Sequence, residues 1–463
     1  MSENVTNVLY LVTIVSFILA LRFLSSPRRA RLGNVVGAAG MLLAIVVTLA
    51  QDAVVEWWTI VVGMAIGGVV GAVSARLVKM TAMPQMVALF NGVGGGAAAL
   101  IALAEFHELA PRAGDIATEE TVAILLSALI GSVSFAGSLI AFAKLQELVS
   151  GRPIVYGGQQ LVNGLVLAGA VVVGAAIVAG VQEEWMLAAV LVGAALFGVF
   201  FVLPIGGADM PVVISFLNAC TGLAASATGF VLHNNVLIVS GALVGASGTL
   251  LTMLMGRAMN RSLANVLFGA FGSVTDAAAA AAGTDGGVVR SASPDDVAIM
   301  LAYARRVVVV PGYGLAVAQA QHDVRALADL LEERGIDVRY AIHPVAGRMP
   351  GHMNVLLAEA NVPYPQLYEM EQINPEFPNT DVALVIGAND VTNPAARNQP
   401  GSPIFGMPIL DVDRARAVVV LKRSMNPGFA GIDNPLYGDP RTVMLFGDAK
   451  ESVLKLMGAV KGI

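Results

Sequence analysis

Apolar residues follow two different patterns along the chain. Over residues 1–260 they form long, almost unbroken runs with short polar breaks, whereas over residues 291–463 short apolar runs alternate with amphipathic segments. A run of about 20 mostly apolar residues is long enough for a helix to cross a bilayer. Runs of this kind occur at residues 4–24, 34–50, 54–75, 83–104, 120–143, 160–180, 185–204, 210–231 and 236–256. The first pattern therefore predicts a membrane α-helical bundle of about nine transmembrane helices.

The charged residues between these runs predict the orientation of the helices. Basic residues collect in alternate breaks, at Arg28, Arg29 and Arg31, at Arg76 and Lys79, at Lys144 and Arg152, and at Arg257 and Arg261. Most of the other breaks are acidic instead. Because Lys and Arg favour the cytoplasmic side of a membrane, we expect the N-terminus outside and the C-terminal part in the cytoplasm. The breaks at 204–209 and 233–235 carry little basic signal, and their sides follow from the alternation alone.

Strand-like apolar runs recur in the second part of the chain. RRVVVVPGYG, DVRYAIHPVAG, DVALVIGAND, RAVVVLKRS and RTVMLFGDA each join a continuous apolar run to a turn. DDVAIMLAYARR before them and AVAQAQHDVRALADLLEERG after the first each have the period of one amphipathic helix. Buried runs between helices are typical of a parallel sheet covered on both faces. This part is therefore predicted to be a soluble α/β, Rossmann-like domain.

A segment rich in Ala, Gly, Ser and Asp separates the two patterns. It reads SVTDAAAAAAGTDGGVVRSASPDD, from Ser273 to Asp296, and it has few side chains to bury. Such a composition is typical of a linker. We therefore expect a transmembrane domain over residues 1–260, a flexible linker over 261–290 and a soluble domain over 291–463.

Composition agrees with this division. Only 13% of the 463 residues are charged, against about 25% in an ordinary soluble domain. The formal net charge of −6 argues against a nucleic-acid partner. The single cysteine, Cys220, cannot form an internal disulfide and is expected to be a small core residue.

A few polar residues interrupt the membrane part. Asn91, Ser138 and Asn218 lie within predicted spans, and Asp209 opens the eighth span. A polar side chain at membrane depth usually faces the bundle interior or a water-filled path. A simple hydrogen bond between helices is the alternative for each of them. No acid, Lys or His lies clearly at mid-membrane depth, so a proton path would need its titratable group from elsewhere.

The soluble part contains the stretch VVVVPGYGLAVAQA, which has the form of a nucleotide-binding turn. Gly312 permits the turn, Gly314 lets a backbone approach a pyrophosphate, and the following helix presents its N–H groups. Val317 occupies the third small position, so this motif alone is equally typical of a generic turn. Three further loops, HPVAGRMPG, GANDVTNP and KRSMNPG, also follow strands. Ligands bind at the carboxyl ends of parallel strands, which makes one shared nucleotide crevice the better interpretation.

The residues after the strands favour NADP over NAD. An NAD site places an acid after the second strand, where this chain has His343, Pro344 and Val345. Lys422, Arg423 and Ser424 follow a later strand and suit a 2′-phosphate, although a solvated charged turn is the alternative. Asp390 is the acid within these loops. It is either a group near the nicotinamide whose ionisation responds to the redox state or a turn-forming aspartate.

Long strings in the chain resemble one family. The chain resembles the β subunit of proton-translocating NAD(P)+ transhydrogenase. The strings that carry the resemblance are GGADMPVVIS, GALVGASG, AMNRS, VVPGYGLAVAQAQ, HPVAGRMPGHMNVLLAEA, ALVIGAND, KRSMNPGFAG and FGDAK, and more loosely MTAMPQMVALF and GSVSFAGSLIAFAKLQ. The resemblance implies reversible hydride transfer between NAD(H) and NADP(H), coupled to proton translocation. It also implies that the soluble domain binds NADP(H), in an orientation inverted on the sheet.

The resemblance implies a set of site residues. The expected nucleotide-binding residues are Gly312, Tyr313, Gly314, Val345, Ala346, Gly347, Arg348, Met349, Pro350, Gly387, Ala388, Asn389, Asp390, Val391, Lys422, Arg423, Ser424, Met425, Asn426, Gly428, Phe429, Asp448 and Ala449, with Asp390 as the catalytic candidate. The expected proton-channel residues are Asn91, Ser138, Asp209 and Asn218. Two departures matter: Asn91 stands where many members have a histidine, and Phe429 where a tyrosine is common.

The same resemblance implies partners. Hydride transfer needs two nucleotides face to face, and the chain shows one dinucleotide fold. The NAD(H) site is therefore expected on an α subunit that carries further transmembrane helices, in a dimer of α–β units within the bacterial plasma (inner) membrane. No metal is expected. The alternative from another class is an NADPH-gated ion transporter or channel without redox chemistry.

Overall fold

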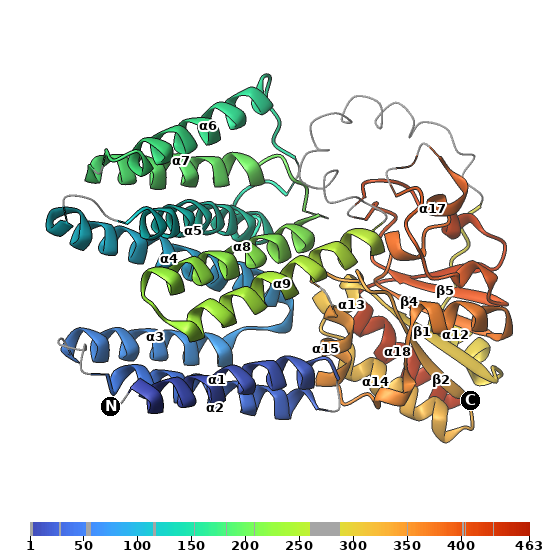
Figure 1. Ribbon diagram of the computed structural model, residues 1–463. Helices are drawn as coiled ribbons and strands as arrows, with labels where there is room; N and C mark the ends of the chain where they lie inside the picture. Colours follow the sequence, from blue (N-terminus) through green and yellow to red (C-terminus); the bar gives the residue numbers. More distant parts are fainter. Residues whose placement is uncertain are drawn as a thin grey trace. The chain divides into compact units, whose positions relative to one another are not determined.

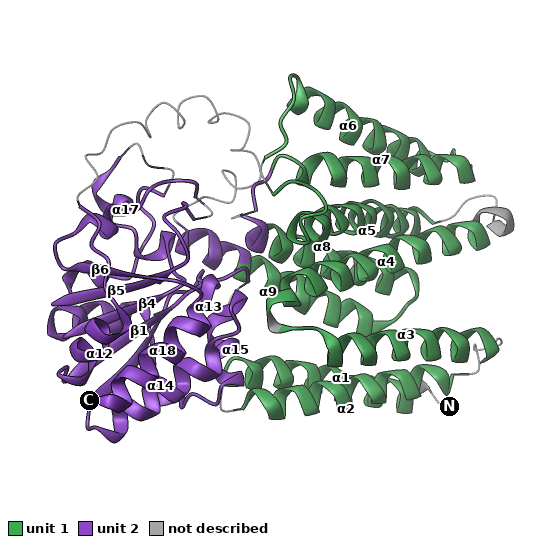
Figure 2. Cartoon of the chain, turned by 180° about the vertical axis from the view of Figure 1, so that it is seen from behind, with its two compact units in different colours: residues 1–204, 213–251 green, residues 205–212, 252–463 purple. Residues whose placement is uncertain are grey.

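The structure is a computed structural model that describes residues 3–26, 29–51, 57–113, 117–151, 153–181, 183–207, 209–259, 288–349, 351–400, 402, 404–428 and 430–463. The chain divides into two compact units, one of residues 1–204 and 213–251 and the other of residues 205–212 and 252–463 (Figure 2). Each unit is described by itself.

The first unit is a bundle of long apolar helices (Figure 1). They are α1 (Glu3–Leu24), α2 (Ala30–Leu49), α3 (Trp57–Leu77), α4 (Met83–Ala113), α5 (Thr118–Leu145), α6 (Gln159–Val178), α7 (Glu184–Val202), α8 (Met210–Val231) and α9 (Asn235–Ala258), with the short η1 (Met80–Ala82) before α4. Within the described ranges, nine helices are long and apolar enough to cross a membrane. The predicted helical membrane bundle is thus confirmed.

Glycines set how closely these helices pack. A Cβ added at Gly95 of α4 would lie 2.8 Å from the carbonyl oxygen of Gly131 in α5, so the two backbones touch there. A Cβ at Gly222 of α8 would lie 2.5 Å from the amide nitrogen of Gly245 in α9. Both contacts require residues without a side chain, as small-residue faces in membrane helices do. In α3, by contrast, Gly63 and Gly67 have no described atom within 4 Å of a built Cβ.

The soluble unit contains a six-stranded parallel sheet. Its strands are β1 (Arg306–Pro311), β2 (Asp337–Ile342), β3 (Leu367–Glu369), β4 (Val382–Ile386), β5 (Ala417–Lys422) and β6 (Thr442–Phe446). Their order is β3-β2-β1-β4-β5-β6, and every paired neighbour is parallel. The order reverses between β1 and β4, which is where ligands bind in doubly wound sheets. The expected Rossmann-like domain is confirmed, and β3 is a strand that the sequence pattern did not predict.

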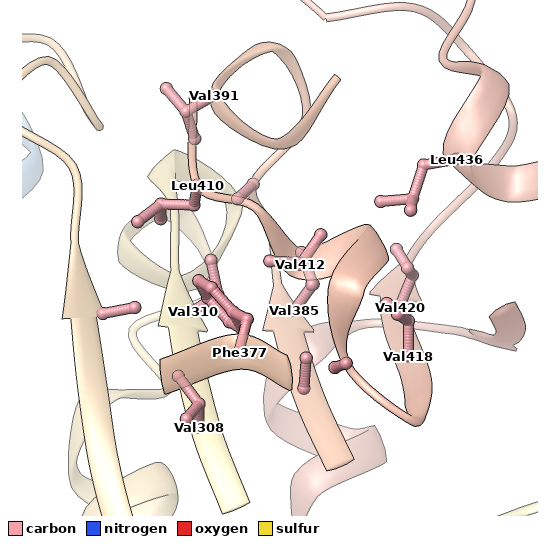
Figure 3. Close-up of a cluster of buried hydrophobic side chains, with 14 of the residues drawn as sticks. Val308, Val310, Phe377, Val385, Val391, Leu410, Val412, Val418, Val420 and Leu436 are labelled. Carbon is pink, nitrogen blue, oxygen red and sulfur yellow. The ribbon is translucent and has the colours of Figure 1, made fainter. Parts of the chain in front are cut away.

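Alternate side chains of the strands bury two faces of this sheet. Val308, Val310, Val385, Val418 and Val420 pack with Phe377, Leu410, Val412 and Leu436 in one buried cluster (Figure 3). Three helices cover the opposite side: α12 (Pro294–Ala302), α14 (Gln321–Glu333) and α18 (Ala449–Gly462). Helix α18 contacts both α12 and α14, and α14 and α18 contact strands β2 and β5, respectively. Burial on both faces explains why the strands read as unbroken apolar runs.

Two predicted helices have other boundaries in the structure. The helix expected after the glycine turn is two helices, α13 (Tyr313–Val317) and α14. Gln319 between them has φ of 50°, a left-handed conformation that cannot continue a right-handed helix. The helix expected over DDVAIMLAYARR ends at Ala302, because Arg306 already pairs with Asp337 at the start of β1.

The C-terminal end of the predicted linker is part of the soluble fold. The carbonyl of Arg290 accepts from the amide of Met444, and the amide of Ala292 donates to the carbonyl of Met444. Ser293 and Asp296 then form a capping box at the start of α12. Residues 261–287 of the predicted linker lie outside the described residues.

Candidate nucleotide-binding site and membrane polar cluster

The loops after β1 and β4 are joined through their backbones. The amide of Gly312 donates to the carbonyl of Ile386 at 2.9 Å, and that of Gly314 donates to the carbonyl of Gly387 at 3.0 Å. Gly387 has φ of 67°, and a Cβ on Gly314 would lie 2.7 Å from its Cα. The sequence predicted that Gly314 makes room for a pyrophosphate. Here the smallness of both turn glycines serves the contact with the β4 loop.

The loop after β2 is organised by two buried histidines. His343 bonds through Nε2 to the carbonyl of Pro408 at 2.8 Å, and its Nδ1 accepts from the amide of Val345. Burial lowers the pKa of His343 to about 4, so it is neutral at pH 7 and donates to Pro408. His352 accepts from the amide of Arg348 at 3.1 Å and fills the space beside Gly347, whose φ is 110°. Burial, followed by the nearby charge of Arg348, lowers the pKa of His352 too.

The β2 loop contacts the β1 loop through Arg348 and His352, which both lie against Tyr313. The Arg348 guanidinium lies 4.4 Å from the centre of the Tyr313 ring, and the His352 ring meets the same tyrosine edge-on at 6.2 Å. Cation–π contacts of this kind hold an arginine at a fixed place while leaving part of its N–H groups for other partners. Val345 and Ala346 come directly before this turn, and Ala346 is buried, at 3% exposed. Pro350 lies outside the described residues, between Met349 and Gly351.

The loops after β4 and β5 meet at Tyr437. This buried tyrosine donates to the side-chain oxygen of Asn389, and Asn434 donates to the carbonyl of Asn389 at 3.1 Å. The ammonium of Lys422 lies 4.8 Å from the centre of the Tyr437 ring and donates to the carbonyl of Asn426 at 2.6 Å. Burial raises the pKa of the Tyr437 phenol, so it remains a donor.

Asp390 lies beneath the loop that follows β5. Its Oδ2 accepts from the amide of Ala430 at 3.0 Å, and a Cβ on Gly428 would lie 2.7 Å from its Oδ1. Burial lowers the pKa of Lys422, and the negative charge of Asp390 opposes that effect. The structure thus brings the candidate acid Asp390 against the β5 loop. Val391, next to it, belongs to the buried cluster under the sheet.

Lys422, Arg423 and Ser424, which form the turn after β5, each contact a different part of the unit. Lys422 is turned toward Tyr437, whereas the Arg423 side chain is 62% exposed and lies 3.3 Å from Asp448. Ser424 accepts from the amide of Asn426 at 3.4 Å. Asp448 also caps α18, which begins at Ala449. Met425 and Asn426 are exposed, and Phe429 lies outside the described residues.

In the membrane unit, the structure joins two of the four expected channel residues. Asn91 of α4 donates to the hydroxyls of Ser138 at 2.9 Å and Ser134 at 3.3 Å, both on α5. Ser134 is 2.6 Å from the hydroxyl of Thr221 on α8. Asn218 lies on α8 as well and is half-buried, and Asp209 precedes that helix. No hydrogen bond joins Asn218 to Asn91 within the described residues.

Several residues of these clusters were missed by sequence reasoning. Tyr437 follows the loops in an unremarkable turn, and nothing in its local pattern marks it. His352 lies in a short helix, α15 (His352–Glu359), that reads as ordinary packing. Ser134 and Thr221 had a usable signal, because each lies on the same helix face as a second hydroxyl seven residues away.

A helical membrane unit joined to a parallel sheet of Rossmann strand order defines the chain as an integral membrane protein with a nucleotide-type soluble domain. The family described as NAD(P) transhydrogenase beta subunit matches residues 6–459. Two proteins named NAD(P) transhydrogenase subunit beta, both from Rhodospirillum rubrum, are each 48% identical over 466 residues, which cover 99% of this chain and 100% of the relative. The chain belongs to the NAD(P) transhydrogenase β-subunit family.

Family membership decides between the two function classes that the sequence left open. It assigns the chain to NAD(P) transhydrogenation coupled to proton translocation, and a transporter without redox chemistry is not favoured. The description of the family as a β subunit implies an α-subunit partner. Among the described residues, no group of three or more His, Cys, Asp or Glu side chains is arranged to hold a metal ion.

Proposed function

We propose that this chain binds NADP(H) on its soluble unit and exchanges hydride with NAD(H) held by the α subunit. The observation that carries the proposal is the meeting of the loops after β1, β2, β4 and β5 at one end of the parallel sheet. Tyr313 contacts Arg348, Gly314 contacts Gly387, and Asn389 contacts Tyr437 beside Lys422. One extended ligand across the carboxyl ends of the strands would touch all of them.

The residues present suit a phosphorylated dinucleotide. Arg348 and Arg423 are cations with several N–H donors each, suited to phosphate oxygens. In this proposal Arg348 with Tyr313 binds the pyrophosphate side, while Arg423 with Lys422 and Ser424 binds the 2′-phosphate. Residues 387–391 lie near the nicotinamide and ribose, with Asp390 as the acid beside them. The loop from Met425 to Gly428 covers the nucleotide.

Direct hydride transfer requires positioning rather than an acid or a nucleophile. When bound, the nicotinamide supplies the redox chemistry, and the protein holds the two rings at the right distance and excludes water. The fixed backbone contact between the β1 and β4 loops and the buried Asn389–Tyr437 pair suit this task, since both limit movement around the proposed nicotinamide site. Asp390 then acts by its charge on the β5 loop, because the amide of Ala430 binds it.

Coupling to the membrane unit is proposed to act through nucleotide affinity. Proton movement past the polar residues of α4, α5 and α8 would change how tightly the soluble unit holds NADP(H). Moving one charge across a membrane releases about 2.3 kcal/mol per 100 mV. At 1.4 kcal/mol per tenfold change, that is enough to shift an equilibrium between open and closed nucleotide states by roughly 50-fold.

The assembly and orientation follow from the same proposal. The N-terminus lies outside and the soluble unit in the cytoplasm of a bacterial inner membrane, as the Arg28 to Arg31 and Arg76 loops indicate. The active form is a dimer of α–β units. This chain alone has no hydride acceptor and is inactive.

Reconstitution of the chain with its α subunit in liposomes tests the function. With NADPH and an NAD analogue of distinct absorbance, the complex is expected to transfer hydride and to move protons in proportion. The chain alone, and the α subunit alone, serve as controls and are expected to show neither. Proton or ion movement on adding NADPH, with no change in nucleotide absorbance, would contradict the enzyme and support a gated transporter.

A further inference from the structure

Three helices of the membrane unit share an inner cluster of hydroxyl groups. Ser134 of α5 lies 2.6 Å from Thr221 of α8. Ser134 donates to the carbonyl of Leu217 at 2.9 Å, and Thr221 donates to the carbonyl of Asn91 on α4 at 3.5 Å. Each hydroxyl has one proton, so one of the pair donates to the other, and the second donates to its carbonyl, on α8 or on α4. We call the pair Ser134 and Thr221 the inner station.

A second cluster of the same kind occurs elsewhere on the same helices. Ser127 of α5 lies 2.7 Å from Thr228 of α8. Ser127 donates to the carbonyl of Ala98 on α4 at 3.1 Å, and Thr228 donates to the carbonyl of Ala224 at 3.0 Å. Ser127 and Thr228 are 0% and 3% exposed. We call the pair Ser127 and Thr228 the outer station, because it lies nearer the N-terminal end of α5.

The two stations are copies of one arrangement, displaced by seven residues on every helix. Asn91 corresponds to Ala98 on α4, Ser134 to Ser127 on α5, and Thr221 to Thr228 on α8. The carbonyls of Leu217 and Ala224 correspond too, each four residues before its threonine. Seven residues make nearly two turns, so the stations lie about 10 Å apart along one face of the three helices.

The copies differ in which hydroxyl serves which carbonyl. At the inner station the serine can donate to α8 and the threonine to α4, whereas at the outer station the serine can donate to α4 and the threonine to α8. Each pair therefore has two possible orientations: the serine donates to the threonine, which donates to its carbonyl, or the threonine donates to the serine, which donates to the other carbonyl. Each hydroxyl has one proton and a neighbour within 2.7 Å, so a hydroxyl can accept a proton from one side as it passes its own to the other.

We propose that Ser127 and Thr228 form an outer relay station of the proton path, in line with the inner station of Ser134 and Thr221 beside Asn91 and Ser138. This rests on the proposed proton translocation through the membrane unit. In a relay step one O–H bond forms at the receiving oxygen while the original O–H bond breaks toward the next acceptor. Rotation of the two hydroxyls then returns the station to its first orientation, with no net change in the protein.

The stretch between the stations determines what else the path needs. There α4 and α5 touch through Gly95 and Gly131, and Ala224 of α8 is fully buried. No described side chain there offers a hydroxyl that joins the two pairs. At about 2.8 Å for each O–H···O step, two or three water molecules would be needed to bridge the 10 Å between them, so the relay requires this closely packed stretch to open to water.

Substitutions that remove one hydroxyl and nearly keep the size of the side chain test the outer station. Thr228→Val and Ser127→Ala, each in the full α–β complex in liposomes, are expected to lower coupled proton translocation at least tenfold. Thr228→Ser keeps the hydroxyl and is expected to retain at least half of it. NADPH affinity is expected to stay within error of the wild type, and the small fall in Tm from one lost hydrogen bond is expected to match that of Ser226→Ala, which a packing role would not predict.

Ser226→Ala is the matched control. Ser226 is two residues from Thr228, and its hydroxyl makes a bond of the same type, to the carbonyl of Ile238 on α9 at 3.0 Å. Normal translocation by Ser226→Ala beside its loss in Thr228→Val and Ser127→Ala would support the relay. Equal losses of translocation in all three variants, losses that accompany a Tm well below that of Ser226→Ala, or full translocation by Thr228→Val and Ser127→Ala would overturn it. A wild-type complex that transfers hydride without moving protons would instead refute the proposed translocation itself.

Discussion

The side chains that join the loops of the soluble unit are buried, while those proposed to touch the nucleotide are more exposed. Tyr437 is 3% exposed and His343 1%, whereas the Arg423 side chain is 62% exposed. The buried groups hold backbone carbonyls and amides in place, and the exposed cation is held by a single ion pair with Asp448. Substitutions at the two kinds of residue should therefore be separable, with stability affected by the first and nucleotide selectivity by the second.

Tyr437→Phe is expected to reduce stability by about 1 kcal/mol, a usual value for one lost hydrogen bond. The variant removes the donor to Asn389 but keeps the ring under Lys422. Thermal unfolding of the complex, monitored in the soluble unit, measures the change. Tyr303→Phe is the control, since Tyr303 is 81% exposed, and it is expected to have no effect. Equal shifts in both variants would show that the Asn389 bond contributes nothing.

Arg423→Ala is expected to weaken NADPH binding more than tenfold while leaving the affinity for NADH unchanged. The reason is that charge-assisted bonds to a phosphate contribute about 1.5–3 kcal/mol, and NADH has no 2′-phosphate. Binding titrations of both nucleotides provide the measurement. Lys455→Ala removes an exposed positive charge on α18 and controls for net charge. If the affinities for both nucleotides fall by the same factor, Arg423 does not bind the 2′-phosphate.

His343 is expected to make the soluble unit less stable in mild acid. Its pKa is about 4 when folded and 6.5 when unfolded, so its contribution is complete above pH 6.5 and is lost as the pH falls from 6.5 to 4. The shift of the pKa corresponds to about 3 kcal/mol. Unfolding measured across this range, compared with His343→Gln, isolates the effect from that of His352. Wild-type and variant curves that stay parallel between pH 7 and pH 4 would rule it out.

At the level of elements, the contact between the β1 and β4 loops determines the shape of the proposed site. It depends on adjacent backbones rather than on side chains, because Gly312, Gly314 and Gly387 have no room for a Cβ. The same principle acts in the membrane unit, where Gly95 and Gly131 bring α4 and α5 together. Close backbone contact brings the hydroxyl-bearing faces of neighbouring helices, and the loops of neighbouring strands, within hydrogen-bonding distance.

Gly387→Ala is expected to destabilise the soluble unit by about 2–4 kcal/mol. Its φ of 67° strains any side chain, and the new Cβ would also clash with Gly314. Gly335→Ala is a matched control, since it has φ of 81° and no atom within 4 Å of a built Cβ. It is expected to cost about 1 kcal/mol. Chemical unfolding of both variants compares them, and equal costs would show that the loop contact is not tight.

On the scale of the whole molecule, the two units differ in the solvent that surrounds them. The membrane unit exposes large apolar residues along its helices, while the soluble unit buries its apolar strands on both faces. In the proposed function the soluble unit meets NADP(H) in water while the membrane unit carries protons. The proposed orientation is therefore a testable property of the molecule.

A cysteine introduced at Lys455 of α18 is expected to react with a membrane-impermeant thiol reagent from the cytoplasmic side only. One introduced at Val181, in the break between α6 and α7, is expected to react from the outside only. Labelling of right-side-out and inside-out vesicles measures this. The natural Cys220 lies within α8, and the unsubstituted chain controls for its reaction. The opposite pattern would reverse the proposed orientation.

Much of the fold could be predicted because it depends on local periodicity. In the part of the chain that the structure describes, the nine apolar helices and five of the six strands follow directly from runs of side chains that match one solvent or one face. Boundaries were less predictable. The left-handed Gln319 divides a helix whose apolar period continues across it, and the three residues of β3 are too few to show a period.

The sequence by itself determined the class of this protein. Long apolar runs permit only membrane helices, alternating basic breaks predict one orientation, and glycine loops after buried strands predict a nucleotide site. The tertiary structure alone decided which residues meet. Tyr437 joins Asn389 and Lys422 from separate loops, and Ser127 reaches Thr228 across 101 positions of sequence. Local patterns reflect solvent and period, whereas such pairs depend on how helices and strands approach one another, which no local pattern encodes.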